Sequence, residues 1–156
     1  MGNNVTLTPV NLAATIEDSL AVVGKSLPQK QISLHAKNGG LDIHLLADDM
    51  LQEVFVNLFS NSAKYTDGKD VNIEVATEIV GRECRIRVSD YGRGISPEQK
   101  PGLFTRYVKN AQGTGLGLSI AHALVVERYG GTITVKDRII GDHSKGTLVE
   151  ISLSAA

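Results

Sequence analysis

A chain of 156 residues, 42% of them hydrophobic, has room for one compact domain with a single core, so residues 1–156 are treated as one domain. Its 16 Lys and Arg residues balance 17 Asp and Glu residues, which argues against the basic face that nucleic-acid or membrane-surface binding usually needs. No apolar stretch approaches the roughly 20 residues of a membrane-spanning helix, and the single cysteine, Cys84, cannot form an internal disulfide, so a cytoplasmic location is expected.

The first part of the chain is predicted to contain a helix and a hairpin. Between residues 12 and 27 apolar side chains recur every three or four positions, which indicates an amphipathic helix that ends near Pro28. Residues 32–36 and 41–46 flank Asn38-Gly39-Gly40, a favourable turn sequence, so these two segments are expected to pair as a β-hairpin.

The middle of the chain predicts a long helix and two strands. The helix covers about Asp49 to Tyr65, with Asp49 and Gln52 as a capping pair at its start and Ser62 on its otherwise apolar buried stripe. Alternating apolar residues over 71–75 and 84–88 indicate two antiparallel strands with one buried face.

The last part begins with an irregular, glycine-rich stretch over residues 91–117. A strongly apolar helix is expected over about 116–129, followed by strands near 132–135 and 147–153. Helices and strands in this order, without strict β-α-β alternation, predict an α+β fold of the two-layer sandwich type.

One side of the long helix carries a polar track. At about 100° per residue, Glu53, Asn57, Asn61 and Lys64 fall within an arc of roughly 80°, at the edge of the apolar stripe. Carboxamide oxygens can ligate Mg²⁺, Lys can neutralise phosphate charge and Glu can accept a proton, so the track suits a phosphate–metal site. The alternative is a solvated helix face with i,i+4 polar pairs, and the helix pattern by itself leaves both open.

Two polar residues continue the buried faces of predicted strands. Asp90 shares the parity of the apolar residues in strand 84–88, and Thr147 shares that of strand 147–153. A buried carboxylate needs donors, which an adenine amino group could supply, and the Thr147 hydroxyl could bridge to the same base. Alternatively, Asp90 accepts hydrogen bonds from backbone amides of its own turn, and Thr147 is an ordinary strand residue.

A glycine-rich loop leads into the apolar helix, and its backbone N–H groups could converge on phosphate at the helix N-terminus. The loop matches neither G-x-x-x-x-G-K-[ST] nor G-x-G-x-x-G, so neither a P-loop nor a dinucleotide-binding βαβ unit is expected. The residues concerned are Gly113, Thr114, Gly115, Leu116, Gly117 and Leu118.

Together these segments resemble the GHKL ATPase superfamily, and specifically the catalytic domain of sensor histidine kinases. Residues 53–66 (EVFVNLFSNSAKYT) resemble the N box, 90–95 (DYGRGI) the first glycine box, 103–107 (LFTRY) the F box and 113–118 (GTGLGL) the second glycine box. The motifs follow the family's order and cover nearly the whole chain. The resemblance implies ATP and Mg²⁺ as cofactors, and a mixed, mostly antiparallel sheet with helices on one face.

Family roles carry over to the matching positions of the long helix. The resemblance implies that Asn57 ligates Mg²⁺, that Asn61 and Lys64 contact phosphate, and that Tyr65 packs against the nucleotide. Glu53 occupies the place of the superfamily's general base, and in this kind of kinase it is expected to polarise the acceptor imidazole. The second glycine box would border the triphosphate.

For the base, the resemblance implies that Asp90 accepts a hydrogen bond from the adenine amino group. The pocket around it would be formed by Gly92, Gly94 and Ile95. The chain departs from the family at Ser62, where Ala is usual, and at Val108-Lys109, where relatives often carry an aromatic residue and an Arg. Contact with the γ-phosphate from the predicted ATP lid is therefore expected from Arg106 or Lys109.

None of the four histidines is expected to be a phosphoacceptor. Family acceptors are typically followed by an acidic residue, whereas the residues after His35, His44, His122 and His143 are Ala, Leu, Ala and Ser. The acceptor is therefore expected on a dimerisation and phosphoacceptor helical hairpin of the same parent protein, outside these 156 residues. The receiver domain of a response regulator would be the next acceptor. The domain alone is expected to be a monomer without nucleic-acid or membrane contacts.

Two other functions stay open. One is a serine kinase of the anti-sigma-factor type, which has the same fold and roughly this length. The other is a nucleotide-sensing module that binds ATP without catalysis. The GTGLGL box and the helix end at Tyr129-Gly130-Gly131 favour the histidine kinase over the serine kinase.

Overall fold

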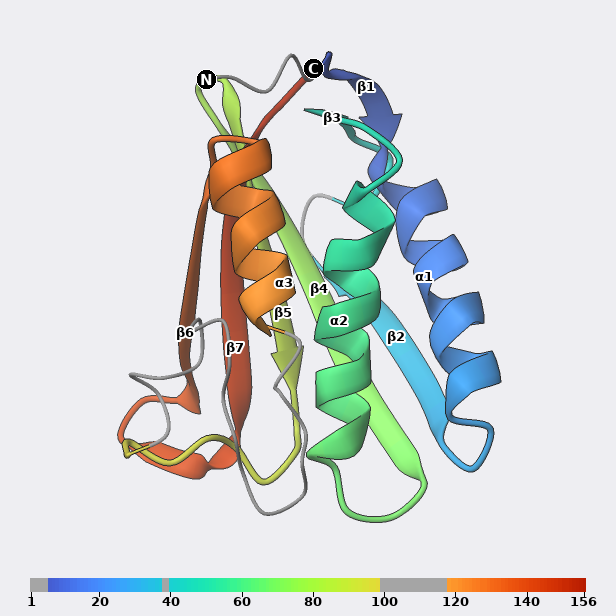
Figure 1. The fold of residues 1–156 in the computed structure, drawn as a ribbon. Helices are drawn as coiled ribbons and strands as arrows, with labels where there is room; N and C mark the ends of the chain where they lie inside the picture. The colour runs from blue at the N-terminus through green and yellow to red at the C-terminus, as the bar shows by residue number, and fades with distance from the viewer. Residues whose placement is uncertain (1–5, 38–39, 99–117) are drawn as a thin grey trace.

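The computed structural model describes residues 6–37, 40–98 and 118–156, which form one layer of strands and one layer of helices (Figure 1). In chain order the elements are β1 (Thr8–Asn11), α1 (Leu12–Ser26), β2 (Gln31–Lys37), β3 (His44–Ala47), α2 (Leu51–Lys64), β4 (Asp70–Val80), β5 (Glu83–Asp90), α3 (Leu118–His122), η2 (Ala123–Arg128), β6 (Thr132–Ile139) and β7 (Asp142–Ser154).

The main sheet has five strands in the order β2-β4-β5-β7-β6. β2 runs parallel to β4, and the pairs β4–β5, β5–β7 and β6–β7 are antiparallel. The helices α1, α2 and α3 lie on one face of this sheet (Figure 1). The predicted two-layer α+β sandwich with a mixed, mostly antiparallel sheet is therefore confirmed. Among the described ranges, no helix is long and apolar enough to cross a bilayer.

The predicted hairpin across Asn38-Gly39-Gly40 is wrong. β2 pairs in parallel with β4, where Leu34 lies opposite Ile73, and β3 pairs with β1 in a separate two-stranded sheet. Parallel strands cannot be joined by a tight turn, and the long connection that they need contains α2. The apolar residues of β2 therefore belong to an edge of the main sheet.

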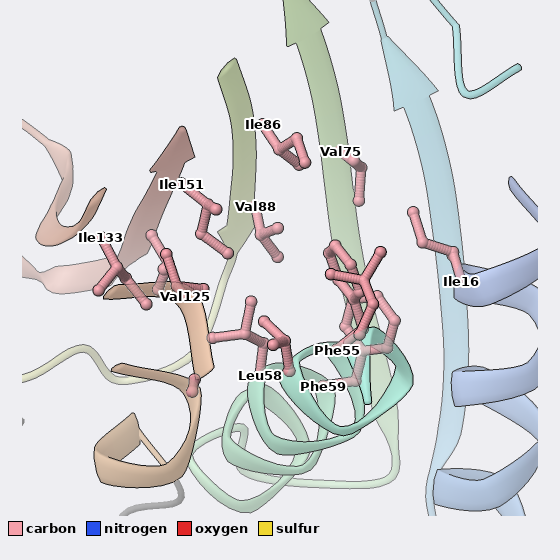
Figure 2. Packing of buried hydrophobic residues seen from close by; sticks show 14 of the residues in the cluster. Ile16, Phe55, Leu58, Phe59, Val75, Ile86, Val88, Val125, Ile133 and Ile151 are labelled. Atoms are coloured by element: carbon pink, nitrogen blue, oxygen red, sulfur yellow. The ribbon is translucent and has the colours of Figure 1, made fainter. Parts of the chain in front are cut away.

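The core lies between the sheet and the helices. Along each inner strand every second residue is buried, as the alternating patterns predict, and Cys84 is one of these buried strand residues. Figure 2 shows side chains from the sheet and the helices meeting in this layer, among them Val75, Ile86, Val88 and Ile151 from the strands and Ile16, Phe55, Leu58, Phe59 and Val125 from the helices.

A carboxylate ties the beginning of α2 to the end of the third helix, which is α-helical over α3 and π-helical over η2. The predicted cap at Asp49 is wrong, because the N-cap of α2 is Met50, which makes no side-chain capping hydrogen bond. In the turn before the helix, Asp48 Oδ1 accepts a hydrogen bond from the backbone N–H of Met50 at 3.1 Å. The same carboxylate accepts hydrogen bonds from the Arg128 guanidinium and, at 2.6 Å, from the Tyr129 hydroxyl. Burial alone would raise the pKa of Asp48, but these hydrogen bonds outweigh it and lower the pKa.

Replacing Ile151 with Ala tests the role of the inner face. Ile151 is fully buried in β7, between Ile86 of β5 and Ile133 of β6, so its truncation should lower the free energy of unfolding by about 2–5 kcal/mol. Ile140→Ala removes the same atoms from a side chain that is 98% exposed, and it should change stability by about 0.5 kcal/mol or less. Urea unfolding followed by circular dichroism measures both, and equal losses would contradict this assignment of the core.

Candidate functional site

A small pocket lies at the end of the main sheet where β5 ends and β7 begins, which is the lower end in Figure 1. The carboxyl end of α2 and the first residue of α3 also contribute to it. Its lining residues are Leu58, Asn61, Ser62, Tyr65, Asp90, Ile95, Leu118, Thr147 and Val149. The volume of the cavity is about 20 Å³, which is enough for a water molecule. A ligand larger than a water molecule would fit only if lining side chains shifted.

Asp90 is the charged group of this pocket, and it is 8% exposed. Its Oδ1 accepts hydrogen bonds from the backbone N–H of Gly92 at 3.0 Å and from the backbone N–H of Thr147 at 3.2 Å. Its Oδ2 accepts one from the Ser62 hydroxyl at 2.9 Å. The alternative raised from the sequence, a carboxylate that accepts from backbone amides, is thus part of the structure. A carboxylate offers about four acceptor positions, so with respect to the described residues one position on Oδ2 is left for a further donor.

Burial acts on the ionisation of this carboxylate. Desolvation raises the pKa of Asp90, while the hydrogen bonds from Gly92, Ser62 and Thr147 and the charge of Arg138 act in the opposite direction. The net pKa stays above its usual value. An additional donor that approaches Oδ2 would stabilise the ionised form further.

Asn61 supplies the second unusual polar group of the pocket. Its side chain is 8% exposed, and its Nδ2 is buried without a hydrogen-bond partner among the described residues. A buried amide donor left unpaired is costly, and such groups are few in folded proteins. The pocket therefore offers a free donor at Asn61 and a free acceptor position at Asp90, which together suit a polar ligand.

The polar track of the long helix is present as predicted, because all four residues lie on α2. Glu53 and Lys64 are exposed, Asn57 is partly exposed and Asn61 is buried, so only the last of these reaches into the pocket. The Asn57 amide nitrogen donates to the carbonyl of Glu53 at 2.6 Å, so the Oδ1 is the atom of this side chain that suits a metal ion. The track thus runs along the helix from an exposed carboxylate to the pocket.

Asn57 fits the role of a magnesium ligand through that oxygen. No group of three or more His, Cys, Asp or Glu side chains gathers as metal ligands within the described ranges. Mg²⁺ in a nucleotide site commonly takes one or two protein oxygens and completes its shell with phosphates and water. A single carboxamide oxygen on α2 is compatible with this donor set.

Tyr65 closes the pocket at the end of α2. It lines the cavity, and the Arg93 guanidinium lies 5.4 Å from the centre of its ring. The backbone carbonyl of Tyr65 accepts a hydrogen bond from the N–H of Arg93 at 2.9 Å. Burial raises the pKa of the Tyr65 hydroxyl, so the ring presents a neutral aromatic surface at neutral pH.

Three glycines allow the backbone segments around Asp90 to approach one another. A Cβ at Gly92 would lie 2.7 Å from the carbonyl oxygen of Tyr65. At Gly94, which has a φ of +77°, a Cβ would overlap the carbonyl of His143, and at Gly146 it would overlap the carbonyl of Asp90. The expected role of Gly92 and Gly94 in forming the pocket therefore has a steric basis.

The remaining predicted site residues divide into two groups. Ile95, Leu118 and Thr147 line the pocket, although Thr147 contacts Asp90 through its backbone N–H. The F box, the lid residues after Glu98 and residues 113–117 of the second glycine box lie outside the described residues, and these include Arg106, Lys109, Gly113, Thr114, Gly115, Leu116 and Gly117. Sequence reasoning did not assign Leu58, Ser62 or Val149 to the site. Of these, Ser62 carried a signal, since it is a hydroxyl on the buried stripe of a helix.

Residues 47–156 match the family described as "Histidine kinase-, DNA gyrase B-, and HSP90-like ATPase". Sensor histidine kinase ZraS of Escherichia coli (strain K12) is 34% identical over 134 residues, which cover 85% of this chain and 28% of ZraS. The chain thus spans less than a third of the length of this curated relative.

Two solved structures share the fold. The catalytic domain of histidine kinase ThkA superposes with a TM-score of 0.78 at 24% identity and covers 96% of both chains. ThkA in complex with the response regulator protein TrrA gives a TM-score of 0.75 at 22% identity, over 96% of this chain and 42% of that one.

Replacing Gly94 with Ala tests the close approach of the loop after β5 to the segment before β7. The loss of stability should clearly exceed that of Gly141→Ala, measured by urea unfolding. Gly141 also has a positive φ, +86°, but a Cβ there meets no atom within 4 Å, so its substitution should cost only about 1–2 kcal/mol of backbone strain. Similar losses in the two variants would show that the contact with His143 is not tight.

Proposed function

Because the chain belongs to the histidine kinase-, DNA gyrase B- and HSP90-like ATPase family, we propose that it binds Mg·ATP and transfers the γ-phosphoryl group to a histidine. The acceptor histidine would lie on a separate dimerisation and phosphoacceptor helical hairpin of the parent protein. The observation that carries this proposal is the pairing of a free acceptor position on Asp90 with the unpaired amide donor of Asn61 in one pocket.

The base would occupy the pocket at Asp90. The adenine amino group would donate to the remaining acceptor position on Oδ2, and Tyr65 would pack against the nucleotide. Apolar contacts would come from Ile95 and Leu118, which are buried and flank Asp90. Since the cavity is narrow in this structure, these side chains are the ones expected to shift when the base enters.

The phosphates would lie along α2, toward its exposed polar residues. Asn61 would donate to phosphate through Nδ2, and Lys64 would add positive charge from the next turn. Asn57 would hold Mg²⁺ through Oδ1, and the ion would neutralise charge on the phosphates. Further contacts are proposed from the second glycine box and from Arg106 or Lys109.

The proposed step is an in-line phosphoryl transfer. A ring nitrogen of the acceptor histidine attacks the γ-phosphorus, the bond to the β–γ bridging oxygen breaks, and ADP leaves. Glu53 is exposed near the start of α2, where a side chain from another domain can reach it, and it would polarise the acceptor imidazole and take its proton. Positioning and charge neutralisation would supply most of the rate enhancement.

The partners follow from this chemistry. The phosphoryl group on the acceptor hairpin would pass to the receiver domain of a response regulator, which fits two-component signalling. ThkA, whose catalytic domain has the same fold, has been solved in complex with a response regulator protein. A cytoplasmic location is part of the same proposal.

Asn57→Ala tests the metal role. The variant should keep its fold, because the Asn57 side chain is partly exposed, and it should lose Mg-dependent nucleotide binding. Isothermal titration calorimetry with Mg·ATP measures this, and Asn72→Ala, which removes an exposed carboxamide from β4, serves as the control. Unchanged Mg·ATP affinity in Asn57→Ala would show that the metal role is wrong.

Phosphotransfer in trans tests the activity. The domain is mixed with Mg·ATP and an acceptor hairpin from a related histidine kinase, and acid-labile phosphohistidine is expected on the hairpin. Acid-stable phosphoserine on a partner would instead indicate the serine kinase of the anti-sigma-factor type. Bound ATP without any transfer, tested with the hairpin of the parent protein, would indicate a nucleotide-sensing module.

A further inference from the structure

Ser62 behaves differently from the other buried serine of a helix in the described ranges. Ser19 on α1 donates its hydroxyl to the carbonyl of Thr15, four residues earlier, at 2.7 Å, which is the usual bond of a serine within a helix. The carbonyl of Gln52 on α2 lies 3.2 Å from the same hydroxyl, so both acceptors of Ser19 are neutral backbone carbonyls. Ser62 on α2 donates across the pocket to Asp90 Oδ2, which is 28 positions away in the sequence, at 2.9 Å. Both serines are buried, so the difference lies in the partner and not in the exposure.

The Ser62 hydrogen bond settles how many donors Asp90 Oδ2 can still accept. Oδ1 already accepts two backbone N–H groups, and Ser62 takes one of the two acceptor positions of Oδ2. The hydroxyl also holds the carboxylate against rotation about its side-chain bonds, because it comes from a helix while the two N–H groups come from the loop after β5 and from β7. Counting the part of the chain that the structure describes, a single acceptor position of fixed direction is left in the pocket.

From this geometry we infer that Ser62 is a positioning residue for base selection. Its hydroxyl fixes Asp90 as a hydrogen-bond acceptor, so that the pocket takes a purine that bears an amino group and rejects a purine that bears a carbonyl at the same position. The inference rests on the proposed function, since it concerns the base of the nucleotide that the pocket would bind. An ionised carboxylate can only accept hydrogen bonds, so it repels a carbonyl oxygen. A protonated Asp90 would carry an O–H donor and would tolerate that oxygen.

The pH dependence follows from the groups around Asp90. Arg138 from β6 is the charged group that acts on the carboxylate. From α2 the pocket receives Ser62 and the titratable Tyr65, from β7 it receives Thr147 and Val149, and β4 places Ile73 opposite Asp90. His143 precedes Thr147 in β7, and its carbonyl borders Gly94.

The pKa of Asp90 determines the direction in which nucleotide affinity changes with pH. Desolvation raises the pKa of Asp90, and the Ser62 hydrogen bond is among the contacts that lower it. Binding of an amino purine needs the ionised form, so affinity is present above the pKa of Asp90 in the free protein and is lost as the pH falls through it. Without the Ser62 hydroxyl this loss should begin at a higher pH.

The test compares ATP with inosine triphosphate, which carries a carbonyl in place of the amino group on the same triphosphate. The ratio of their dissociation constants is measured by isothermal titration calorimetry between pH 5.5 and 8, and titration of the phosphates cancels in this ratio. As the pH is lowered, the preference for ATP should begin to decline at a higher pH in Ser62→Ala than in the wild type. At the lowest pH the preference should be at least about tenfold weaker than in the wild type, because a hydrogen bond to a charged group is lost.

Two further variants separate the hydroxyl from packing. Ser62→Cys keeps nearly the same volume but has only a weak donor, so its preference for ATP should show the same pH dependence as that of Ser62→Ala. If the Ala variant does not fold, the Cys variant provides the test. Ser19→Ala removes an equally buried hydroxyl away from the pocket and should keep the wild-type ratio at every pH.

The failure of this inference differs from the failure of the proposed function. If Ser62→Ala keeps the wild-type ratio of dissociation constants at every pH, the role of the hydroxyl is overturned while ATP binding stands. The same result in Ser62→Cys would overturn it if the Ala variant does not fold. Absence of binding by the wild-type domain to both nucleotides at every pH would instead overturn the proposed function, and with it the base on which the inference acts.

Discussion

The hydrogen bonds to the Asp90 carboxylate hold the site together. A buried carboxylate is unfavourable unless donors surround it, and here the donors come from three separate segments: Ser62 on α2, Gly92 in the loop after β5, and Thr147 on β7. The charge thereby fixes the end of the helix against the ends of two neighbouring strands. Within the described ranges, the carboxylate thereby keeps one acceptor position without a donor, although the segments that hold it are fixed by hydrogen bonds.

Glycine makes this convergence sterically possible. Side chains at Gly94 or Gly146 would overlap backbone carbonyls of the facing segment, so the loop after β5 could not lie against the start of β7. Asn61 adds a second unfavourable element, because its buried Nδ2 lacks a partner among the described residues. Local costs of this kind tend to gather at functional sites, where the rest of the fold maintains them. The apolar layer between sheet and helices supplies that support (Figure 2).

The two ends of the helical layer serve different purposes. At one end Asp48 binds Arg128 and Tyr129 and so joins the start of α2 to the end of the third helix. At the other end α2 and α3 contribute residues to the pocket, where Leu118 is the last residue of the second glycine box and its only described one. The helices are thus anchored by charged hydrogen bonds far from the pocket (Figure 1). This division places the charged anchor of the helices at the end of the helical layer opposite the pocket.

The sequence by itself determined the features that repeat with a local period. The helical track from Glu53 to Lys64 and the strand parity of Asp90 and Thr147 are consequences of backbone geometry, and they predicted the candidate site, while the order of helices and strands predicted the fold class. Only the tertiary structure decided which distant groups meet. The parallel partner of β2, the link from Asp48 to the third helix, and the hydrogen bond from Ser62 to Asp90 all join residues far apart in the chain. No local pattern specifies such pairs, because they depend on how packed layers bring one element against another.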